Sequence, residues 1–226
     1  MNFQKNTDEV FQAVSQATEE AHRPQNSVKI IAVTKYVDSS IAKDLIKTGI
    51  EHIGENRVDQ FLEKYEALAD LDLTWHLIGS LQRRKVKDVI NYVDYFHALD
   101  SVKLAAEIQK RANKPIKCFL QVNVSKEESK HGFMVEEVHQ AIDAIKEYDK
   151  IELVGLMTMA PFEADQAELD EIFSKTHALQ KELSERGLAR MPFSELSMGM
   201  SGDYKEAIAH GSTFVRIGTA FFKWGK

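Results

Sequence analysis

The sequence predicts a (β/α)8 barrel (a TIM barrel), in which eight parallel strands close into a ring inside a layer of helices. Three observations indicate this fold class. Eight short runs of apolar and β-branched residues occur along the 226 residues. Amphipathic, helix-type patterns separate these runs, so that strand and helix alternate through nearly the whole chain. No linker rich in Pro, Gly or Ser divides the chain, which predicts one domain over residues 1–226.

An extra helix precedes the first strand. Apolar residues recur at helical spacing from Val10 to Ala21, and we expect this segment to cap the barrel. The first strand is expected over residues 29–36, an apolar run of the kind that is buried on both faces in a parallel sheet. Asp38 and Ser39 both offer N-caps for the next helix, and Gly49 offers its end.

The remaining strands repeat this pattern. We expect them at residues 52–56, 74–79, 93–99, 117–124, 153–159, 193–198 and 213–218. A doubly wound open sheet is the alternative architecture, but such a sheet rarely uses eight strands with nothing left over.

Composition excludes several classes of protein. With 29 Lys and Arg against 35 Asp and Glu, the net charge of −6 gives no electrostatic reason to expect nucleic acid or an acidic membrane as partner. No apolar run approaches the roughly 18 residues of a membrane span, and the first residues lack the apolar core of a signal peptide. The single cysteine, Cys118, excludes an internal disulfide and reads as a small core residue. A cytoplasmic protein is expected.

Lys35 is the most informative single residue. Most lysines that end a strand simply reach solvent. This lysine follows an apolar strand, however, and strand ends of a barrel converge on one mouth, where barrel enzymes place their chemistry. Loss of water around such an amine disfavours the ammonium form and makes the amine nucleophilic. Lys35 is therefore a candidate Schiff-base lysine.

Two loops of small residues follow the seventh and eighth strands. Residues 197–203 read SMGMSGD, and residues 216–219 read RIGT. Small residues let backbone N–H groups approach an anion, and we expect the Ser201 hydroxyl and the amides that open the next helix to form a phosphate site. Either loop alone could be an ordinary turn. Both loops together, beside a candidate imine lysine, favour a phosphorylated aldehyde as ligand.

Arg216 has two interpretations, a structural ion pair or a donor to the pyridine nitrogen of pyridoxal phosphate. A guanidinium stays charged, so it would leave that nitrogen unprotonated and the ring a weaker electron sink. His76 is expected to be a hydrogen-bonded histidine of the barrel interior. The eight histidines show no metal-site spacing, and we predict no metal.

Several motifs occur in a fixed order that resembles a known family. They are residues 32–35 (AVTK), 54–56 (GEN), 76–85 (HLIGSLQRRK), 155–157 (GLM), 196–203 (LSMGMSGD) and 215–219 (VRIGT). The chain resembles the pyridoxal phosphate homeostasis proteins, which are single-domain relatives of the alanine racemase barrel. The similarity covers essentially the full length.

The resemblance implies specific site residues and a function. It implies a fold like the N-terminal domain of alanine racemase and a pyridoxal phosphate (PLP) Schiff base on Lys35. It also implies Arg216 at the ring nitrogen and Ser201, Gly218 and Thr219 at the phosphate. The other pocket residues would be Asn56, His76, Ser197 and Met198. The family is regarded as cofactor-carrying and regulatory, keeping vitamin B6 and amino-acid pools in balance, without an established catalytic activity.

The choice between carrier and enzyme depends on a second base. Racemases of the related fold take that base from a second domain of a partner subunit, and we expect no room for such a domain after the eighth strand. Without the base, two-sided proton transfer is poorly supported. A PLP carrier is therefore predicted, with a weak amino-acid racemase as the alternative. A barrel aldolase would need a carboxylate near the lysine, for which Glu55 is the one candidate.

Further expectations concern partners and one loop. PLP-dependent apo-enzymes are possible recipients of the cofactor, and the capping helix favours a monomer. The charged loop of residues 125–133 is expected at the mouth, as a mobile flap or an ordinary surface loop.

Overall fold

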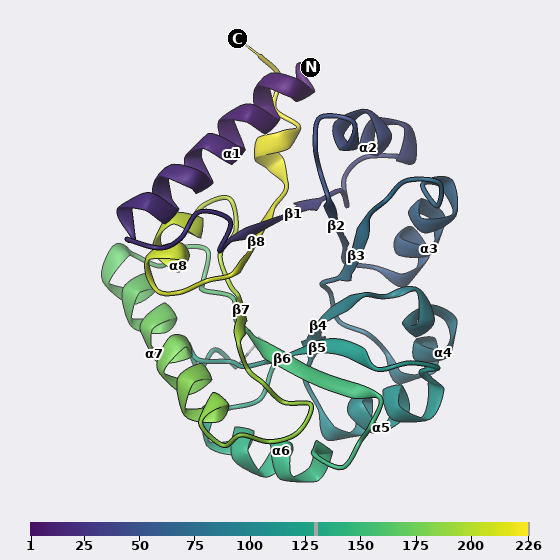
Figure 1. Ribbon diagram of the computed structural model, residues 1–226, viewed down its shortest axis with the longest axis vertical. Helices are drawn as coiled ribbons and strands as arrows, with labels where there is room; N and C mark the ends of the chain where they lie inside the picture. The colour runs from purple at the N-terminus through teal and green to yellow at the C-terminus, as the bar shows by residue number, and fades with distance from the viewer. Residues whose placement is uncertain (129–130, 226) are drawn as a thin grey trace.

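The computed structural model describes residues 1–128 and 131–225, and these residues form a closed parallel barrel (Figure 1). The strands are hydrogen-bonded in the order β1-β2-β3-β4-β5-β6-β7-β8, and the last strand pairs with the first. The strands are β1 (Lys29–Val33), β2 (His52–Glu55), β3 (Thr74–Leu77), β4 (Tyr95–Leu99), β5 (Ile116–Gln121), β6 (Ile151–Met157), β7 (Glu195–Ser197) and β8 (Phe214–Ile217). The (β/α)8 prediction is confirmed.

The register between β1 and β8 closes the ring. Ile31 lies opposite Arg216, and Ala32 lies opposite Ile217. Each expected strand is present, but most are shorter than their apolar runs. In particular, β1 ends at Val33, so Lys35 lies in the turn after the strand and not within it.

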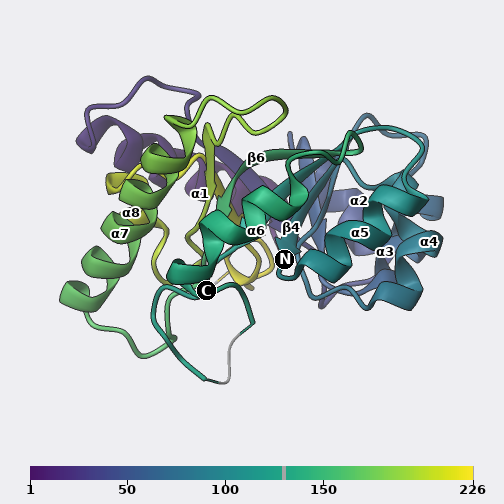
Figure 2. The ribbon, with the colours of Figure 1, turned by 90° about the horizontal axis from the view of Figure 1, so that it is seen from below.

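Helices surround the barrel on its outside (Figures 1 and 2). The α-helices are α1 (Phe3–Glu20), α2 (Ser39–Ile46), α3 (Val58–Ala67), α4 (Val86–Val89), α5 (Val102–Arg111), α6 (Val138–Ile145), α7 (Gln166–Ser184) and α8 (Tyr204–Ala209). Short 3₁₀ helices are η1 (Arg83–Lys85), η2 (Ile90–Tyr92), η3 (Val135–Glu137) and η4 (Thr219–Phe221). As expected, the Asp38 side chain caps α2 by accepting a hydrogen bond from the Ile41 amide. None of the helices within the described residues is long and apolar enough to cross a bilayer.

The N-terminal helix takes a place that the sequence did not predict. It lies in the outer ring of helices and contacts α8, η4 and α2, so it does not cap an end of the barrel (Figure 1). Asn6 fixes it there, because its side-chain amide donates to the carbonyls of Phe221 and Lys223 at 2.8 and 2.9 Å. Since only the short η4 follows β8 in the described residues, α1 fills the position beside β8 that a helix after that strand would occupy.

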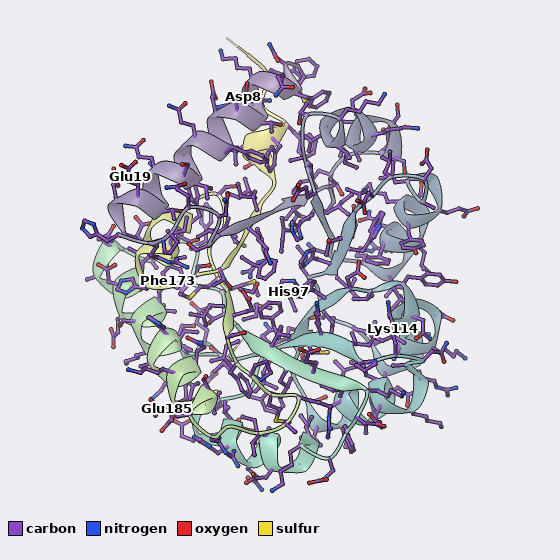
Figure 3. All side chains as sticks on the ribbon, viewed as in Figure 1. Asp8, Glu19, His97, Lys114, Phe173 and Glu185 are labelled. Carbon is purple, nitrogen blue, oxygen red and sulfur yellow. The ribbon has the colours of Figure 1, made fainter. Side chains whose placement is uncertain are left out.

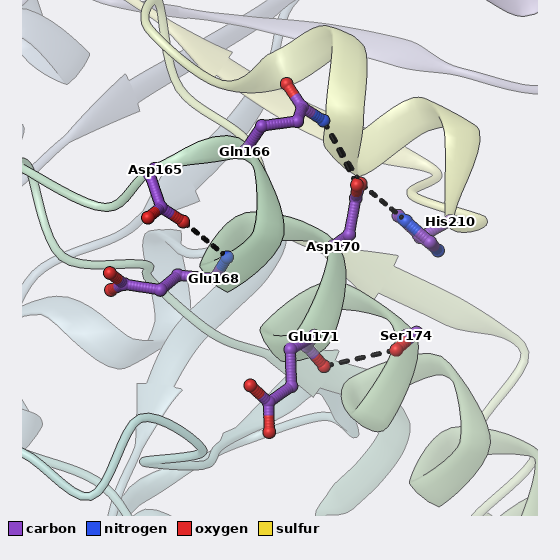
Figure 4. Close-up of polar contacts among 7 residues, drawn as sticks. All are labelled: Asp165, Gln166, Glu168, Asp170, Glu171, Ser174 and His210. Atoms are coloured by element: carbon purple, nitrogen blue, oxygen red, sulfur yellow. Dashed lines mark hydrogen bonds and ion pairs between the residues drawn. The ribbon is translucent and has the colours of Figure 1, made fainter.

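Helices α7 and α8 are joined by a polar cluster (Figure 4). Asp165 caps α7 by accepting a hydrogen bond from the Glu168 amide at 2.9 Å. One turn further on, Asp170 contacts His210 at 3.0 Å, directly after α8. This contact connects the C-terminal end of α8 to the long helix α7.

Aromatic rings fill the half of the barrel interior that lies near the N-terminal ends of the strands. Phe214 lies centrally, with its ring centroid 5.2 Å from Tyr95, 5.4 Å from His76 and 5.7 Å from Phe119. Cys118 is fully buried on the same sheet, and its burial raises the pKa of the thiol, as expected for an inert core residue. Because side chains fill this half of the interior, the C-terminal ends of the strands are the place where a ligand site can form.

We predict that Gly155→Ala destabilises the barrel. An added Cβ would come within 1.8 Å of the Glu195 carbonyl oxygen on β7, so the two paired strands would have to separate. Overpacking of this kind costs on the order of 1–3 kcal/mol. Urea unfolding would measure the loss. The matched control is Gly225→Ala, where a Cβ meets nothing within 4 Å, and equal stabilities of the two variants would contradict the prediction.

Candidate functional site

A cavity of about 810 Å³ opens where the strands end. It is lined by six of the nine predicted site residues, from the ends of β1, β2, β7 and β8: Lys35, Asn56, Ser201, Arg216, Gly218 and Thr219. Residues far apart in the sequence therefore meet at one mouth, as the barrel predicts. The other three, His76, Ser197 and Met198, are fully buried beneath the cavity and are not part of its lining.

Lys35 lies at the boundary between two hollows. It lines the large cavity and also a neighbouring one of about 280 Å³ beside Tyr36. Its side chain is half-buried, and its Nζ lies 4.8 Å from the centroid of the exposed Tyr36 ring, a cation–π contact. The amine thus reaches the cavity from the rim.

A buried ion pair holds the backbone next to this lysine. Lys64 of α3 donates from Nζ to the Thr34 carbonyl at 2.7 Å and to Glu55 Oε1 at 2.5 Å. The Thr34 hydroxyl donates to the same carboxylate oxygen at 2.6 Å. Because both polar groups of Thr34 are bound, the turn that carries Lys35 is fixed. Glu55 does not line the cavity, so the aldolase alternative loses its candidate carboxylate.

Arg216 forms the polar floor of the cavity. Its guanidinium donates from Nη1 to Ser197 Oγ at 2.5 Å and from Nη2 to the Thr158 carbonyl at 3.2 Å. Burial lowers the pKa of this guanidinium to about 10, while the negative charge of Asp203 opposes the shift. The residue therefore stays charged at neutral pH, and it offers its remaining N–H groups to a ligand.

The loops after β7 and β8 hold unused N–H donors. Among the described hydrogen bonds, none comes from the backbone amides of Ser201, Gly202, Gly218 or Thr219. Of the amides at the start of α8, those of Asp203 and Tyr204 donate to the Met200 carbonyl at 3.1 and 2.9 Å, so the binding of an anion by this helix start stays a prediction. The unused amides of the two loops, together with the hydroxyls of Ser201 and Thr219, suit a phosphate.

Gly199 makes the first of these loops possible. Its φ of +102° is a conformation that L side chains rarely adopt, and an added Cβ would lie 2.8 Å from the Ala207 Cβ. The positive φ turns the chain back toward β8, where the Gly199 carbonyl accepts a hydrogen bond from the Arg216 amide. The same turn brings Ser201 and Gly202 to the cavity.

The walls of the cavity are largely apolar. They come from the strand ends, the loop before α7 and the first turn of α7: Val33, Ile78, Ala98, Met157, Met159, Ala160, Pro161, Phe162, Ala164 and Leu169. One polar atom in this wall has no partner among the described residues, the buried Gln121 Oε1. An apolar slot with an amine, a guanidinium, an unpartnered amide oxygen and a cluster of N–H donors fits a flat aromatic aldehyde with a phosphate.

Several residues of the site were not predicted from the sequence. His97 is buried below Arg216, and Gln121 lies in the wall. The sequence signal that could have identified them is that each is a polar residue facing inward on a barrel strand, His97 on β4 and Gln121 on β5. The described part of loop 125–133 is anchored at its base, because Asn123 donates to the Phe133 and Glu127 carbonyls. Ser129 and Lys130 of that loop lie outside the described residues, so the flap prediction stays a prediction.

Comparisons with known proteins agree with this fold and site. The family model for the alanine racemase N-terminal domain matches residues 7–224. The curated pyridoxal phosphate homeostasis protein of Aquifex aeolicus is 39% identical over 225 residues, which are 98% of each chain. That of Escherichia coli is 33% identical over 225 residues, covering 96% of this chain and 94% of the other.

The chain is also similar to solved structures. PipY of Synechococcus elongatus, with PLP bound, has a TM-score of 0.85 and 29% identity, and covers 98% of this chain and 100% of its own. Alanine racemase of Corynebacterium glutamicum has a TM-score of 0.70 at 15% identity, covering 95% of this chain and 62% of its own, which shows the shared fold alone.

Fold and site thus define a barrel of the alanine racemase N-terminal type, with a lysine amine, an arginine guanidinium and two loops of small residues at its mouth. Within that class, the chain belongs to the family of the pyridoxal phosphate homeostasis proteins.

We predict that Lys64→Ala strongly destabilises the fold, because it leaves the Glu55 carboxylate buried without its partner. Removal of one member of a buried ion pair costs about 3–5 kcal/mol. The free energy of unfolding in urea measures the effect. Lys175→Ala is the control, since Lys175 pairs with Glu171 at 2.7 Å on an exposed face where water screens the charges. A small loss in both variants would show that the buried pair does not anchor the turn.

Proposed function

We propose that the chain binds pyridoxal 5'-phosphate as a Schiff base on Lys35 and acts in intracellular PLP homeostasis and amino-acid balance. The observation that carries the proposal is one cavity that joins the Lys35 amine, the Arg216 guanidinium and the unused N–H donors of two loops. The similarity to pyridoxal phosphate homeostasis proteins and to PipY, whose structure holds PLP, supports it.

Each part of the cofactor has a matching group in the cavity. The Lys35 amine condenses with the aldehyde, which forms one C=N bond and releases one water molecule. The phosphate is held by Ser201, Gly218 and Thr219, with Gly202 as an added donor. Asn56 flanks the ring from the end of β2. Ser197, Met198 and His76 support the floor from below, so their role toward the cofactor is indirect.

Arg216 sets the chemistry of the bound cofactor. When bound, PLP supplies an aldehyde for imine formation and a ring that can accept electrons. A charged guanidinium donates to the ring nitrogen and leaves it unprotonated, which weakens the ring as an electron sink. The site is therefore suited to holding the cofactor more than to transamination.

A weak amino-acid racemase is the second candidate function. It is favoured by one observation, that His131 lines the same cavity as Lys35 and carries an imidazole, the side chain that most often serves as a general acid or base. His131 contacts Asp100 at 3.8 Å, and burial raises the pKa of that carboxyl group. A carrier remains the first proposal, because an exposed side chain at the rim is a poorly placed second base.

The proposal also covers partners, oligomeric state and location. We propose that the protein passes PLP to PLP-dependent apo-enzymes, that it is a monomer, and that it is located in the cytoplasm. With the described helices covering the outside of the barrel, the barrel needs no second copy to bury its strands. Native mass spectrometry would measure subunit count and bound cofactor together, and a dimer would correct the monomer assignment.

Lys35→Ala is expected to abolish the yellow colour of the PLP-loaded protein, because no amine remains for the imine. Borohydride is expected to reduce the native imine to a stable adduct on the peptide that contains Lys35. Lys47→Ala, at an exposed position after α2, is the matched control and should load as the native chain does. An adduct on another lysine in the native chain would refute the assignment.

The PLP-loaded protein is expected not to racemise amino acids at enzymic rates. Single-enantiomer alanine, serine and valine would be incubated with it, and chiral chromatography would follow the opposite enantiomer. Typical enzymes turn over about 10 times per second. Turnover on the scale of seconds would favour the racemase, and its loss in His131→Gln would identify the second base.

A further inference from the structure

A line of side chains runs through the barrel from the half-buried His52, at the start of β2, to the buried Arg216. His52 Nδ1 lies 2.9 Å from His76 Nε2, and His76 Nδ1 lies 2.8 Å from His97 Nε2. His97 Nδ1 in turn lies 2.7 Å from Ser197 Oγ, which accepts from Arg216. Figure 3 places the labelled His97 near the centre of the barrel. Five residues from five different strands thus form one continuous chain of hydrogen bonds.

Arg216 fixes the direction of this chain. A guanidinium only donates hydrogen bonds, so Ser197 Oγ accepts from it. Among the described hydrogen bonds, the other partner of this hydroxyl is His97 Nδ1, so His97 Nδ1 is the acceptor for the hydroxyl hydrogen. A neutral imidazole that accepts at one nitrogen carries its hydrogen on the other. His97 therefore donates from Nε2 to His76, and His76 donates from Nε2 to His52.

The surroundings keep the two inner histidines neutral. His76 and His97 are fully buried, and desolvation holds the pKa of each well below its ordinary value. The charge of Arg216 lowers the pKa of His97 further. Each ring is therefore a neutral dipole at physiological pH, as the direction of the chain requires.

The direction of the chain places negative dipole ends toward Arg216. Each imidazole presents a lone pair on the side of the arginine and its N–H on the far side. Within the described residues, the hydrogen-bond partners of the guanidinium are Ser197 and the Thr158 carbonyl, and no carboxylate is among them. A buried cation without a bonded carboxylate needs such compensation.

We propose that Ser197, His97, His76 and His52 form a one-directional hydrogen-bond chain that stabilises and positions the Arg216 guanidinium in place of a carboxylate. The four are positioning residues, since they act through Arg216. A buried carboxylate there would neutralise the guanidinium, whereas the chain leaves its full charge facing the cavity. The link to the ring nitrogen rests on the proposed function, but the direction of the chain does not.

The direct test is the tautomer of each histidine by ¹⁵N NMR of the protein without cofactor at pH 7.5. The chain predicts hydrogen on Nε2 and none on Nδ1 for both His76 and His97. Hydrogen on Nδ1 of His97, or a doubly protonated ring, would overturn the proposal. This result is independent of PLP, so it stands even if the proposed cofactor fails to bind.

Two variants at one position separate positioning from packing. His97→Gln keeps an acceptor for Ser197 and a donor for His76, whereas His97→Phe keeps the volume and loses both. We expect the Gln variant to preserve the His76 tautomer and the absorbance maximum of the PLP-loaded protein. The Phe variant should lose the His76 pattern, shift the maximum and weaken PLP binding about tenfold or more.

His139→Gln is the control, because His139 pairs with Glu182 on the surface, away from the chain. An unchanged His76 tautomer in His97→Phe would overturn the proposal. So would equal shifts of the absorbance maximum in the Gln and Phe variants. If the native chain does not bind PLP but the tautomers follow the prediction, the chain is correct and the proposed cofactor is wrong.

Discussion

The pairing of the first strand with the last is the constraint on which the site depends. The register of β1 and β8 sets Ile31 opposite Arg216, and so brings the turn with Lys35 beside the loop that follows β8. The amine and the guanidinium lie 181 positions apart in the sequence, and ring closure alone places them in one cavity. Helix α1 supports this closure from outside, through its contacts with η4 and α8.

Electrostatics of the buried arginine then determine what the site can do. Arg216 keeps its charge although it is buried, because dipoles and a carbonyl satisfy it while Asp203 acts at longer range. The positive charge is left available to a ligand. At the end of the adjacent strand β1, the Lys64–Glu55 pair makes the turn with Lys35 rigid. The hydrogen-bond partners of Arg216 and the Lys64–Glu55 pair do not line the cavity, so they position its residues without occupying it.

Sequence reasoning recovers the fold and the rim of the site because both depend on local pattern. Alternating apolar runs indicated the strands, and Lys35 and the small-residue loops stand out at strand ends. The chain of histidines depends on which inward-facing residues meet across the barrel, for example His97 and Ser197, 100 positions apart. The place of α1 was wrong for a similar reason, since its apolar stripe shows that one face is buried but not against what.

A crystal structure of the protein grown with excess PLP tests the central claim most directly. The account predicts continuous density from Lys35 Nζ to the ring, with Arg216 at the ring nitrogen and the phosphate on the loops of Ser201 and Gly218. A Lys35 side chain without an adduct, pointing into solvent beside a cavity that holds no cofactor, would contradict it.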